Sequence, residues 1–210
     1  LADIATKVIL GKSLKEQGIC KIYPEEKKRW YVKVPAFSFA KLNGMDAYVS
    51  PEMKSTGEAI GYDKKLHRAM YKAMIASGIR VQNYGTVIVT LADEDKEEAL
   101  PLVRRFYDMG FNIEATSLTA EHLKQHGIRT RVLGKPSEGS SEILDAIRAG
   151  YVSYVINTRA ILSGVHYEDG VAIRSAATQN NITMFTSLDT VRVLLDVLEE
   201  ITIGVSAING

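Results

Sequence analysis

The second part of the chain shows a regular alternation of short apolar runs and longer amphipathic segments. The apolar runs cover residues 86–91, 111–115, 129–133, 151–156 and 183–186. Between and after them, residues 93–109, 118–126, 141–149, 171–180 and 188–201 have helical spacing of apolar positions. Strands that alternate with helices of this length form right-handed βαβ units. The pattern therefore predicts an α/β fold with a parallel five-stranded sheet flanked by helices.

The first eighty residues follow a less regular pattern. Apolar spacing predicts a helix over residues 3–17 that ends at Gly18, and a strand over residues 30–34 that is closed by Pro35. After a loop at residues 51–58, Asp63 is expected to cap a helix that runs to about Ser77. The apolar residues expected on the buried side of this helix are Leu66, Met70, Met74 and Ile75.

One strand and two helices bury little between them, so we expect this first part to be the end of a larger domain. Residues 78–85 have a polar centre and are bounded by glycines, which is typical of a hinge. The sequence thus predicts two units, at residues 1–79 and 84–210. The chain starts without methionine and without a signal-peptide pattern, and we expect it to be a piece of a longer protein.

The run G-F-N-I-E-A-T-S-L-T at residues 110–119 leads from a predicted strand into a predicted helix. A helix N-terminus presents unpaired backbone N–H groups and the positive end of the helix dipole. The hydroxyls of Thr116 and Thr119 are placed to complete a cradle for phosphate or carboxylate there. Threonine is common at helix starts as a plain capping residue, and this segment by itself favours that role. The anion-binding interpretation stays open and depends on what the other strand ends carry.

Other polar residues follow the remaining strands. Because the carboxyl ends of parallel strands meet at one edge of a sheet, these residues are expected to lie together and to bind a charged small molecule. A lysine suits phosphate, and an asparagine suits a hydroxyl or a base edge. Lys96 also fits a solvated helix face, and Asn157 its own turn. The residues concerned are Thr90, Lys96, Lys135, Asn157 and Thr158.

Composition restricts the classes of partner. The chain is 46% hydrophobic and 24% charged, as in ordinary globular proteins, and its 26 Lys and Arg residues nearly balance its 25 Asp and Glu residues. We therefore expect neither nucleic acid nor a membrane as partner. Cys20 is the one cysteine, which excludes an intrachain disulfide and fits a cytoplasmic location. His122 and His126 lack an H-E-x-x-H context, and we expect no metal site.

Two N-terminal motifs carry a family resemblance. The run A-D-I-A-T-K-V-I-L-G-K-S-L at residues 2–14 and the run P-E-M-K-S-T-G-E at residues 51–58 resemble the closing segments of the second ATP-grasp half of the carbamoyl-phosphate synthase large chain. The rest is similar to the C-terminal regulatory domain of that enzyme, which has the Rossmann-like methylglyoxal-synthase-like fold. The resemblance covers nearly the whole chain and implies an incomplete ATP-grasp segment followed by an allosteric domain.

The resemblance implies a parent ligase that makes carbamoyl phosphate from glutamine-derived ammonia, bicarbonate and two ATP, with Mg²⁺ or Mn²⁺. Such an enzyme works with a glutaminase small chain and feeds pyrimidine and arginine synthesis. In the family, the carboxylates that hold ATP and metal lie before the first residue here, so this fragment alone is expected to be inactive. Glu58 is either a carboxylate near the carbamate route or an ordinary loop residue.

Regulatory domains of this family bind nucleotide effectors, UMP and in some members IMP. The resemblance places Lys96, Thr116, Thr119 and Lys135 at phosphate-binding positions. It places Thr90, Asn157, Thr158 and Arg159 at positions that face the ribose and base. Two residues depart from the family pattern: Leu118 stands where a glycine usually precedes the second threonine, and Arg159 stands where a second hydroxyl often follows.

Three alternatives remain open. A methylglyoxal synthase acting on dihydroxyacetone phosphate needs a carboxylate base beside the phosphate cradle, and the loop at residues 136–141 has serine in place of that family's aspartate, with Glu138 as the nearest substitute. A second alternative is a module for N-acetylglutamate. A third is a homo-oligomer contact that has lost effector binding.

Overall fold

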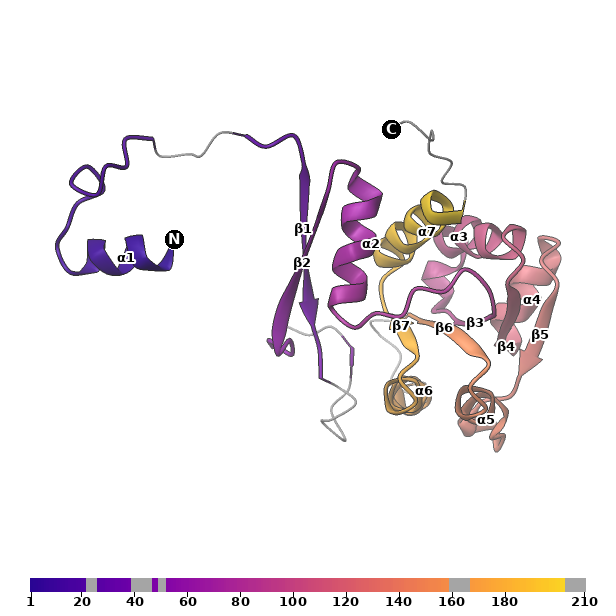
Figure 1. The fold of residues 1–210 in the computed structure, drawn as a ribbon. Coiled ribbons are helices and arrows are strands. Elements are labelled where there is room, and N and C mark those ends of the chain that lie inside the picture. The colour runs from indigo at the N-terminus through magenta and orange to yellow at the C-terminus, as the bar shows by residue number, and fades with distance from the viewer. Residues whose placement is uncertain (22–25, 39–46, 49–51, 159–166, 203–210) are drawn as a thin grey trace.

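The sheet of the second part has the predicted parallel architecture. A computed structural model describes residues 1–21, 26–38, 47–48, 52–158 and 167–202. Its five-stranded sheet has the order β5-β4-β3-β6-β7, and every neighbouring pair is parallel (Figure 1). The strands are β3 (Thr86–Thr90), β4 (Asn112–Thr116), β5 (Thr130–Leu133), β6 (Val152–Asn157) and β7 (Thr183–Phe185). The predicted fold class is confirmed.

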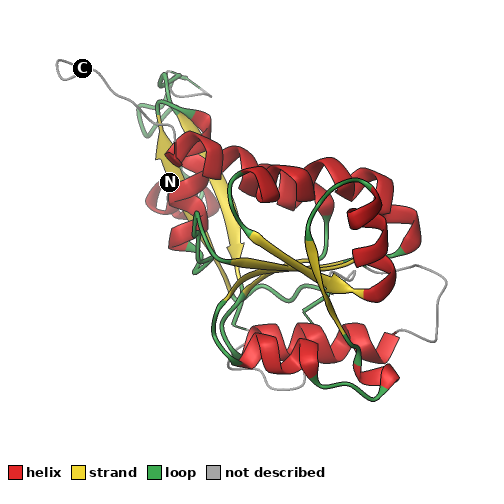
Figure 2. Ribbon diagram, turned by 90° about the vertical axis from the view of Figure 1, so that its right-hand side faces the viewer, coloured by secondary structure: helices red, strands yellow, loops and turns green. Residues whose placement is uncertain are grey.

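Helices cover both faces of this sheet, as Figure 2 shows. One face packs against α3 (Lys96–Asp108), α4 (Ser117–Gln125) and α7 (Leu188–Thr202), whose apolar residues share one core cluster. The other face packs against α5 (Glu142–Arg148) and α6 (Tyr167–Gln179). Short 3-10 turns, η2 (Asp93–Asp95) and η3 (Pro136–Glu138), precede α3 and follow β5. Helix α6 begins earlier than the expected residue 171.

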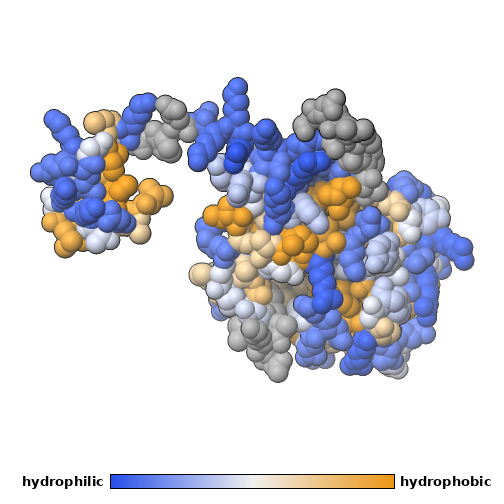
Figure 3. Space-filling model, viewed as in Figure 1, coloured by the Kyte–Doolittle hydropathy of each residue, from blue (hydrophilic) through white to orange (hydrophobic). Residues whose placement is uncertain are grey.

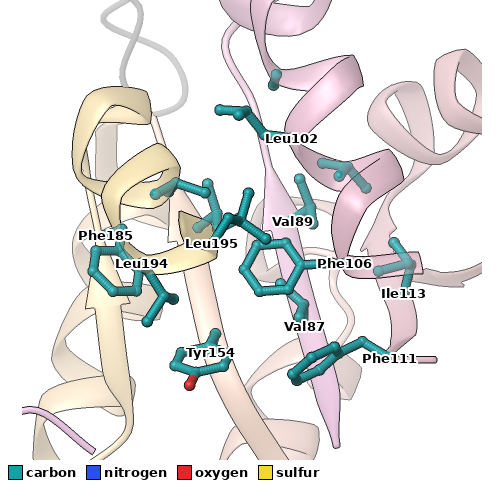
Figure 4. Packing of buried hydrophobic residues seen from close by; sticks show 14 of the residues in the cluster. Val87, Val89, Leu102, Phe106, Phe111, Ile113, Tyr154, Phe185, Leu194 and Leu195 are labelled. Atoms are coloured by element: carbon teal, nitrogen blue, oxygen red, sulfur yellow. The ribbon is translucent and has the colours of Figure 1, made fainter. Parts of the chain in front are cut away.

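Aromatic side chains form the centre of the larger core cluster (Figure 4). Phe106 from α3 meets Phe111 edge to face, with ring centroids 5.3 Å apart, and both rings contact Tyr154 of β6. The Tyr154 hydroxyl donates to the carbonyl of Gln82 at 2.7 Å and accepts from the Gln82 N–H at 2.6 Å. Burial therefore removes the ring from water without leaving its hydroxyl unpaired.

The predicted hinge is attached to the sheet. Besides the contact between Gln82 and Tyr154, the Arg80 N–H donates to Thr183 Oγ1, which donates back to the Arg80 carbonyl. Ser153 Oγ donates to the carbonyl of Tyr84. This segment thus runs along the N-terminal ends of β6 and β7, where hydrogen bonds between side chains and backbone hold it. The division into units 1–79 and 84–210 stays a prediction.

The first part contains α1 (Ala2–Ile9), a two-stranded antiparallel sheet of β1 (Trp30–Ala36) and β2 (Gly57–Asp63), and α2 (Leu66–Ala76). In Figure 1, α1 lies apart from the rest. Helix α2 packs against β2 on one side and α7 on the other. Lys65 makes an ion pair with Glu200 of α7, at 2.9 Å.

Three expectations for this part are wrong. Helix α1 ends at Ile9 instead of residue 17, and Gly11 follows in a left-handed conformation with φ +93°. Strand β2 was not expected, because the sequence GEAIGYD has little strand propensity of its own and gains its structure by pairing with β1. Asp63 closes β2 and does not cap α2, whose N-cap residue is Lys65.

The buried side of α2 also differs from the expectation. Ala69, Ala73 and Met74 are buried, whereas Ile75 is 46% exposed. The small residues allow close packing, since a Cβ at Gly61 of β2 would overlap the Ala69 carbonyl oxygen and the Ala73 nitrogen. Within the described ranges, no helix is both long enough and apolar enough to cross a membrane.

Candidate functional site

The centre of the sheet contains a topological switch point. From β3 the chain proceeds to β4 and β5 on one side, and β6 proceeds to β7 on the other side. In open parallel sheets, such a point leaves a crevice beyond the carboxyl ends of the two central strands. Here those ends carry Thr90 and Asn157, which are paired in register. Both are buried, at 7% and 4% exposure.

A chain of hydrogen bonds connects the two strand ends. Arg174 of α6 donates from Nη1 to Asn157 Oδ1 at 2.7 Å, and Asn157 Nδ2 donates to Thr90 Oγ1 at 2.6 Å. Thr90 Oγ1 in turn donates to the carbonyl of Ile156 at 3.3 Å. Since polar groups leave water at a cost unless they are paired, this chain of hydrogen bonds fixes the side chains at the switch point.

The loops after β3 and β6 are joined above the same strand ends. The Thr158 N–H donates to the carbonyl of Thr90 at 3.1 Å, and Thr158 Oγ1 accepts from the Ala92 N–H at 2.9 Å. Thr158 therefore holds the start of both loops together. Arg159, the next predicted residue, lies outside the residues that the structure describes.

The turn between β4 and α4 provides two buried hydroxyls. Thr116 is the N-cap residue of α4, yet its side chain makes no capping hydrogen bond to this helix start. Thr116 Oγ1 donates to Thr119 Oγ1 at 3.4 Å, and Thr119 Oγ1 accepts from the Leu91 N–H at 3.3 Å. The plain capping role does not account for the two threonines, and they connect the end of β4 to the end of β3.

The side chain of Leu118 points away from this turn. It is 58% exposed, whereas its neighbours Thr119 and Ala120 are 1% and 0% exposed. Because α4 turns its buried face toward the sheet, the leucine extends into solvent and does not fill the space between the two threonines.

The two predicted lysines follow β3 and β5, the strands on either side of β4. Lys96 is the first residue of α3, and its Nζ is 2.6 Å from Asp93 Oδ1. Its side chain is 15% exposed. Lys135 follows β5 by two residues, and β5 pairs Leu133 with Thr116. Lys135 is therefore carried at the strand end beside the threonine turn.

A buried carboxylate and a buried guanidinium were not predicted. Asp169 of α6 is 6% exposed and accepts hydrogen bonds from the N–H and the hydroxyl of Ser137 in η3. Arg174 is 2% exposed. A signal for Arg174 exists in the sequence: Gly170 precedes it by one helical turn, and a small residue at that spacing leaves room for a long side chain.

Two further predicted carboxylates lie elsewhere. Glu58 is on β2 of the two-stranded sheet and makes an ion pair with Lys33 at 2.8 Å. Glu138 is exposed, and its Oε2 accepts from the Lys135 N–H at 3.2 Å, so it turns back on its own loop. The described residues contain no group of three or more His, Cys, Asp or Glu side chains suited to a metal ion.

A comparison with protein families agrees with this geometry. Residues 98–186 match the model of the MGS-like domain, so this part of the chain is a methylglyoxal-synthase-like domain. The matched range includes Thr116, Thr119, Lys135 and Asn157, whereas Thr90 and Lys96 precede it.

Proposed function

We propose that this methylglyoxal-synthase-like domain is the regulatory part of a carbamoyl-phosphate synthase large chain, and that it binds a nucleoside monophosphate such as UMP or IMP. The observation that carries the proposal is the turn at Thr116 and Thr119. Its hydroxyls are buried at the positive end of α4, do not cap the helix, and adjoin the strand that leads to Lys135.

In the proposed complex the phosphate lies against this turn. Helix N–H groups and threonine hydroxyls donate to its oxygens, and Lys96 and Lys135 supply positive charge. The ribose and base extend across the switch point toward Thr90, Asn157 and Thr158, with Arg159 as a further contact. Leu118 lies at the exposed rim of the turn.

The proposed parent enzyme is a glutamine-hydrolysing ligase of the cytoplasm that supplies pyrimidine and arginine synthesis. Residues 1–79 would be the end of its second ATP-grasp domain, with Glu58 near the carbamate route. ATP and Mg²⁺ or Mn²⁺ would bind in the rest of that domain, and a glutaminase small chain would bind the parent chain. Exposed apolar side chains support further packing of this part, among them Trp30, Tyr31, Ile60 and Tyr62.

Regulation would follow from a difference in affinity. An effector shifts a conformational equilibrium only as far as it binds one state better than the other. The packing of α2 against α7 and the ion pair of Lys65 with Glu200 join the proposed effector domain to the proposed catalytic part. These contacts are the physical connection through which such a difference would act.

The lyase alternative has little support in the geometry. Its chemistry requires a carboxylate free to take a proton from the substrate. Glu138 accepts from the backbone of its own loop, and both oxygens of Asp169 accept from Ser137. We expect no methylglyoxal from dihydroxyacetone phosphate, and turnover above background in a colorimetric assay would overturn the regulatory proposal in favour of an enzyme.

Calorimetric titration of residues 1–210 tests the proposed site. UMP or IMP should bind the unaltered protein, and Thr119→Ala and Lys135→Ala should each weaken binding about ten-fold or more, because each removes a hydrogen bond to a charged group. Lys124→Ala, at an exposed lysine near the other end of α4, is the control and should have no effect. N-acetylglutamate serves as a non-phosphate ligand. Nucleotide binding that is equal in all variants would exclude this site.

A further inference from the structure

The largest fully buried side chain of the described residues belongs to a charged residue, Arg174. A buried guanidinium is costly unless several partners compensate its lost hydration. Two of its partners lie on different parts of the chain: Nη1 donates to Asn157 Oδ1 at 2.7 Å, and Cζ lies 5.5 Å from the ring centroid of Tyr48. Arg174 therefore stands between the carboxyl edge of the sheet and a residue of the first part.

The bond from Arg174 fixes how Asn157 is oriented. A guanidinium has only donors, so the amide must turn its oxygen toward Arg174 and its NH₂ group toward Thr90. The 2.6 Å bond from Nδ2 to Thr90 Oγ1 follows from that orientation. If the guanidinium moves away, the amide oxygen of Asn157 loses this donor, and the Asn157 side chain at the switch point is held less firmly.

On its other side, Arg174 meets a residue that is joined to β2. The carbonyl of Tyr48 accepts a hydrogen bond from Lys54 Nζ at 2.7 Å, and β2 begins three residues after Lys54. A cation over an aromatic face is attracted to the ring, more strongly when both are withdrawn from water. The position of Tyr48 and that of the guanidinium are therefore mutually dependent.

The room for this guanidinium depends on one glycine. A Cβ placed at Gly170 would lie 2.9 Å from Arg174 Nη1 and 3.6 Å from Asn157 Oδ1. A real methyl group is not found so close to another atom, and the flexible end of the arginine is the group able to move. Gly170→Ala is thus a way to displace the guanidinium without removing it.

We propose that Arg174 is a positioning residue that couples the carboxyl-edge site to the first part of the chain through Tyr48. Ligand binding at Asn157 and Thr90 holds the guanidinium, and the guanidinium holds Tyr48. By thermodynamic reciprocity, contacts that fix Tyr48 must then also favour the ligand. The identity of the ligand rests on the proposed function, whereas the contact of Arg174 with Tyr48 does not.

The ligand-free protein tests the coupling alone. In Gly170→Ala, hydrogen exchange of peptides that contain Tyr48 should become several-fold faster, because the displaced cation no longer holds the ring. Tyr48→Ala should have the same effect, and adding Gly170→Ala to it should produce no further change. Tyr84→Ala, at a tyrosine that is 69% exposed, is the control. Alanine favours a helix over glycine, so folding should be kept. Unchanged exchange in Gly170→Ala would overturn the coupling.

Calorimetry with two probes then tests the positioning role. UMP should bind roughly three- to ten-fold more weakly to Gly170→Ala, Arg174→Lys and Tyr48→Ala, since the cation–π contact and the amide orientation are lost. Tyr48→Phe should restore the affinity, because it keeps the aromatic face. Inorganic phosphate, which needs only the threonine turn and the lysines, should bind every variant equally.

The outcomes separate the two proposals. If UMP binds the unaltered chain and all variants with the same affinity, the nucleotide site stands and the positioning role of Arg174 is overturned. If UMP and IMP bind neither the unaltered chain nor any variant, the proposed effector function is overturned, and the exchange experiment alone decides whether Arg174 holds Tyr48.

Discussion

The two parts of the molecule use their apolar residues differently. In the sheet domain, β3 and β6 are buried along their whole length. Of the described residues before Thr86, four are buried: Gly61, Ala69, Ala73 and Met74. The difference follows from layers, because two strands and one helix enclose no interior, whereas a sheet covered on both faces does. Apolar content alone therefore does not determine where a core forms.

The first part is held together by local pairs. Tyr31 and Tyr62 stack across the strand pair with centroids 5.9 Å apart, although they are 55% and 52% exposed. Lys33 and Glu58 form an exposed ion pair between the same strands. Figure 3 shows apolar side chains on the surface of the separate N-terminal helix and again over the body beside it. Such pairs each contribute only about 0.2–1 kcal/mol.

The largest contrast is expected from matched aromatic substitutions. Phe106→Ala removes a ring that is fully buried between Phe111 and Tyr154, and should lower the free energy of unfolding by about 3–5 kcal/mol. Trp30→Ala removes a ring that is 54% exposed and should cost about 1 kcal/mol or less. Urea unfolding followed by circular dichroism measures both. Equal losses would contradict the difference in burial.

Alkaline pH should lower the free energy of unfolding of the sheet domain, because the phenol of Tyr154 ionises more readily in the unfolded chain. Burial raises the pKa of Tyr154 from the ordinary 10.0 to about 12, partly opposed by its hydrogen bond with the backbone of Gln82. Between these values the unfolded chain releases the proton and the folded chain keeps it. Stability is therefore unaffected below about pH 10 and falls by about 2–3 kcal/mol as the pH rises through 12.

A single substitution isolates this effect. Tyr154→Phe keeps the ring and removes the titrating hydroxyl, so its loss of stability between about pH 10 and 12 should be smaller than that of the unaltered protein. The variant should also be less stable at neutral pH by roughly 1 kcal/mol, because the hydroxyl bonds with Gln82 are gone. Parallel pH profiles of the two proteins would show that Tyr154 is not responsible.

The smallest of the three effects concerns the close approach of Gly61 in β2 to the backbone of α2. Gly61→Ala forces a methyl group into the backbone of α2 at Ala69 and Ala73, which has no flexible end to move. We expect a cost of about 1–3 kcal/mol for overpacking, confined to the packing of β2 on α2. Hydrogen exchange should rise in β1 and β2 and stay unchanged in β3 and β6. Gly57→Ala, where added atoms meet nothing within 4 Å, is the matched control.

The five-stranded sheet could be predicted because each of its strands has a local sequence signal, an apolar run bounded by glycine and polar residues. Strand β3, for example, was expected at residues 86–91 and covers Thr86–Thr90. Strand β2 has two glycines and two acidic residues in GEAIGYD and exists because β1 lies beside it. No local sequence pattern indicates that a strand will have such a partner. The early end of α1 likewise has no local sequence signal that we identified.

The predicted site residues share one edge of the sheet because the carboxyl ends of parallel strands lie together. The sequence pattern predicts parallel strands, and therefore it also predicts this shared edge. The structure brings Thr90, Asn157 and Thr158 into contact, and joins Thr116 to Thr119. Arg174 was missed because an arginine in an amphipathic helix is usually a solvated residue. Its burial depends on Gly170, Asn157 and Tyr48, which come from three separate segments.

The pairing of β3 with β6 also bears on the order of events in folding. The Thr90 and Asn157 side chains meet although 67 positions separate them along the chain. Bringing such distant segments together costs loop-closure entropy that local contacts do not repay, so pairings of this kind form slowly. The polar edge at these two strand ends exists only after this closure, and any molecule bound there stabilises folded chains over partly folded ones by mass action. A ligand of this edge would therefore slow unfolding and act as a reporter of complete assembly.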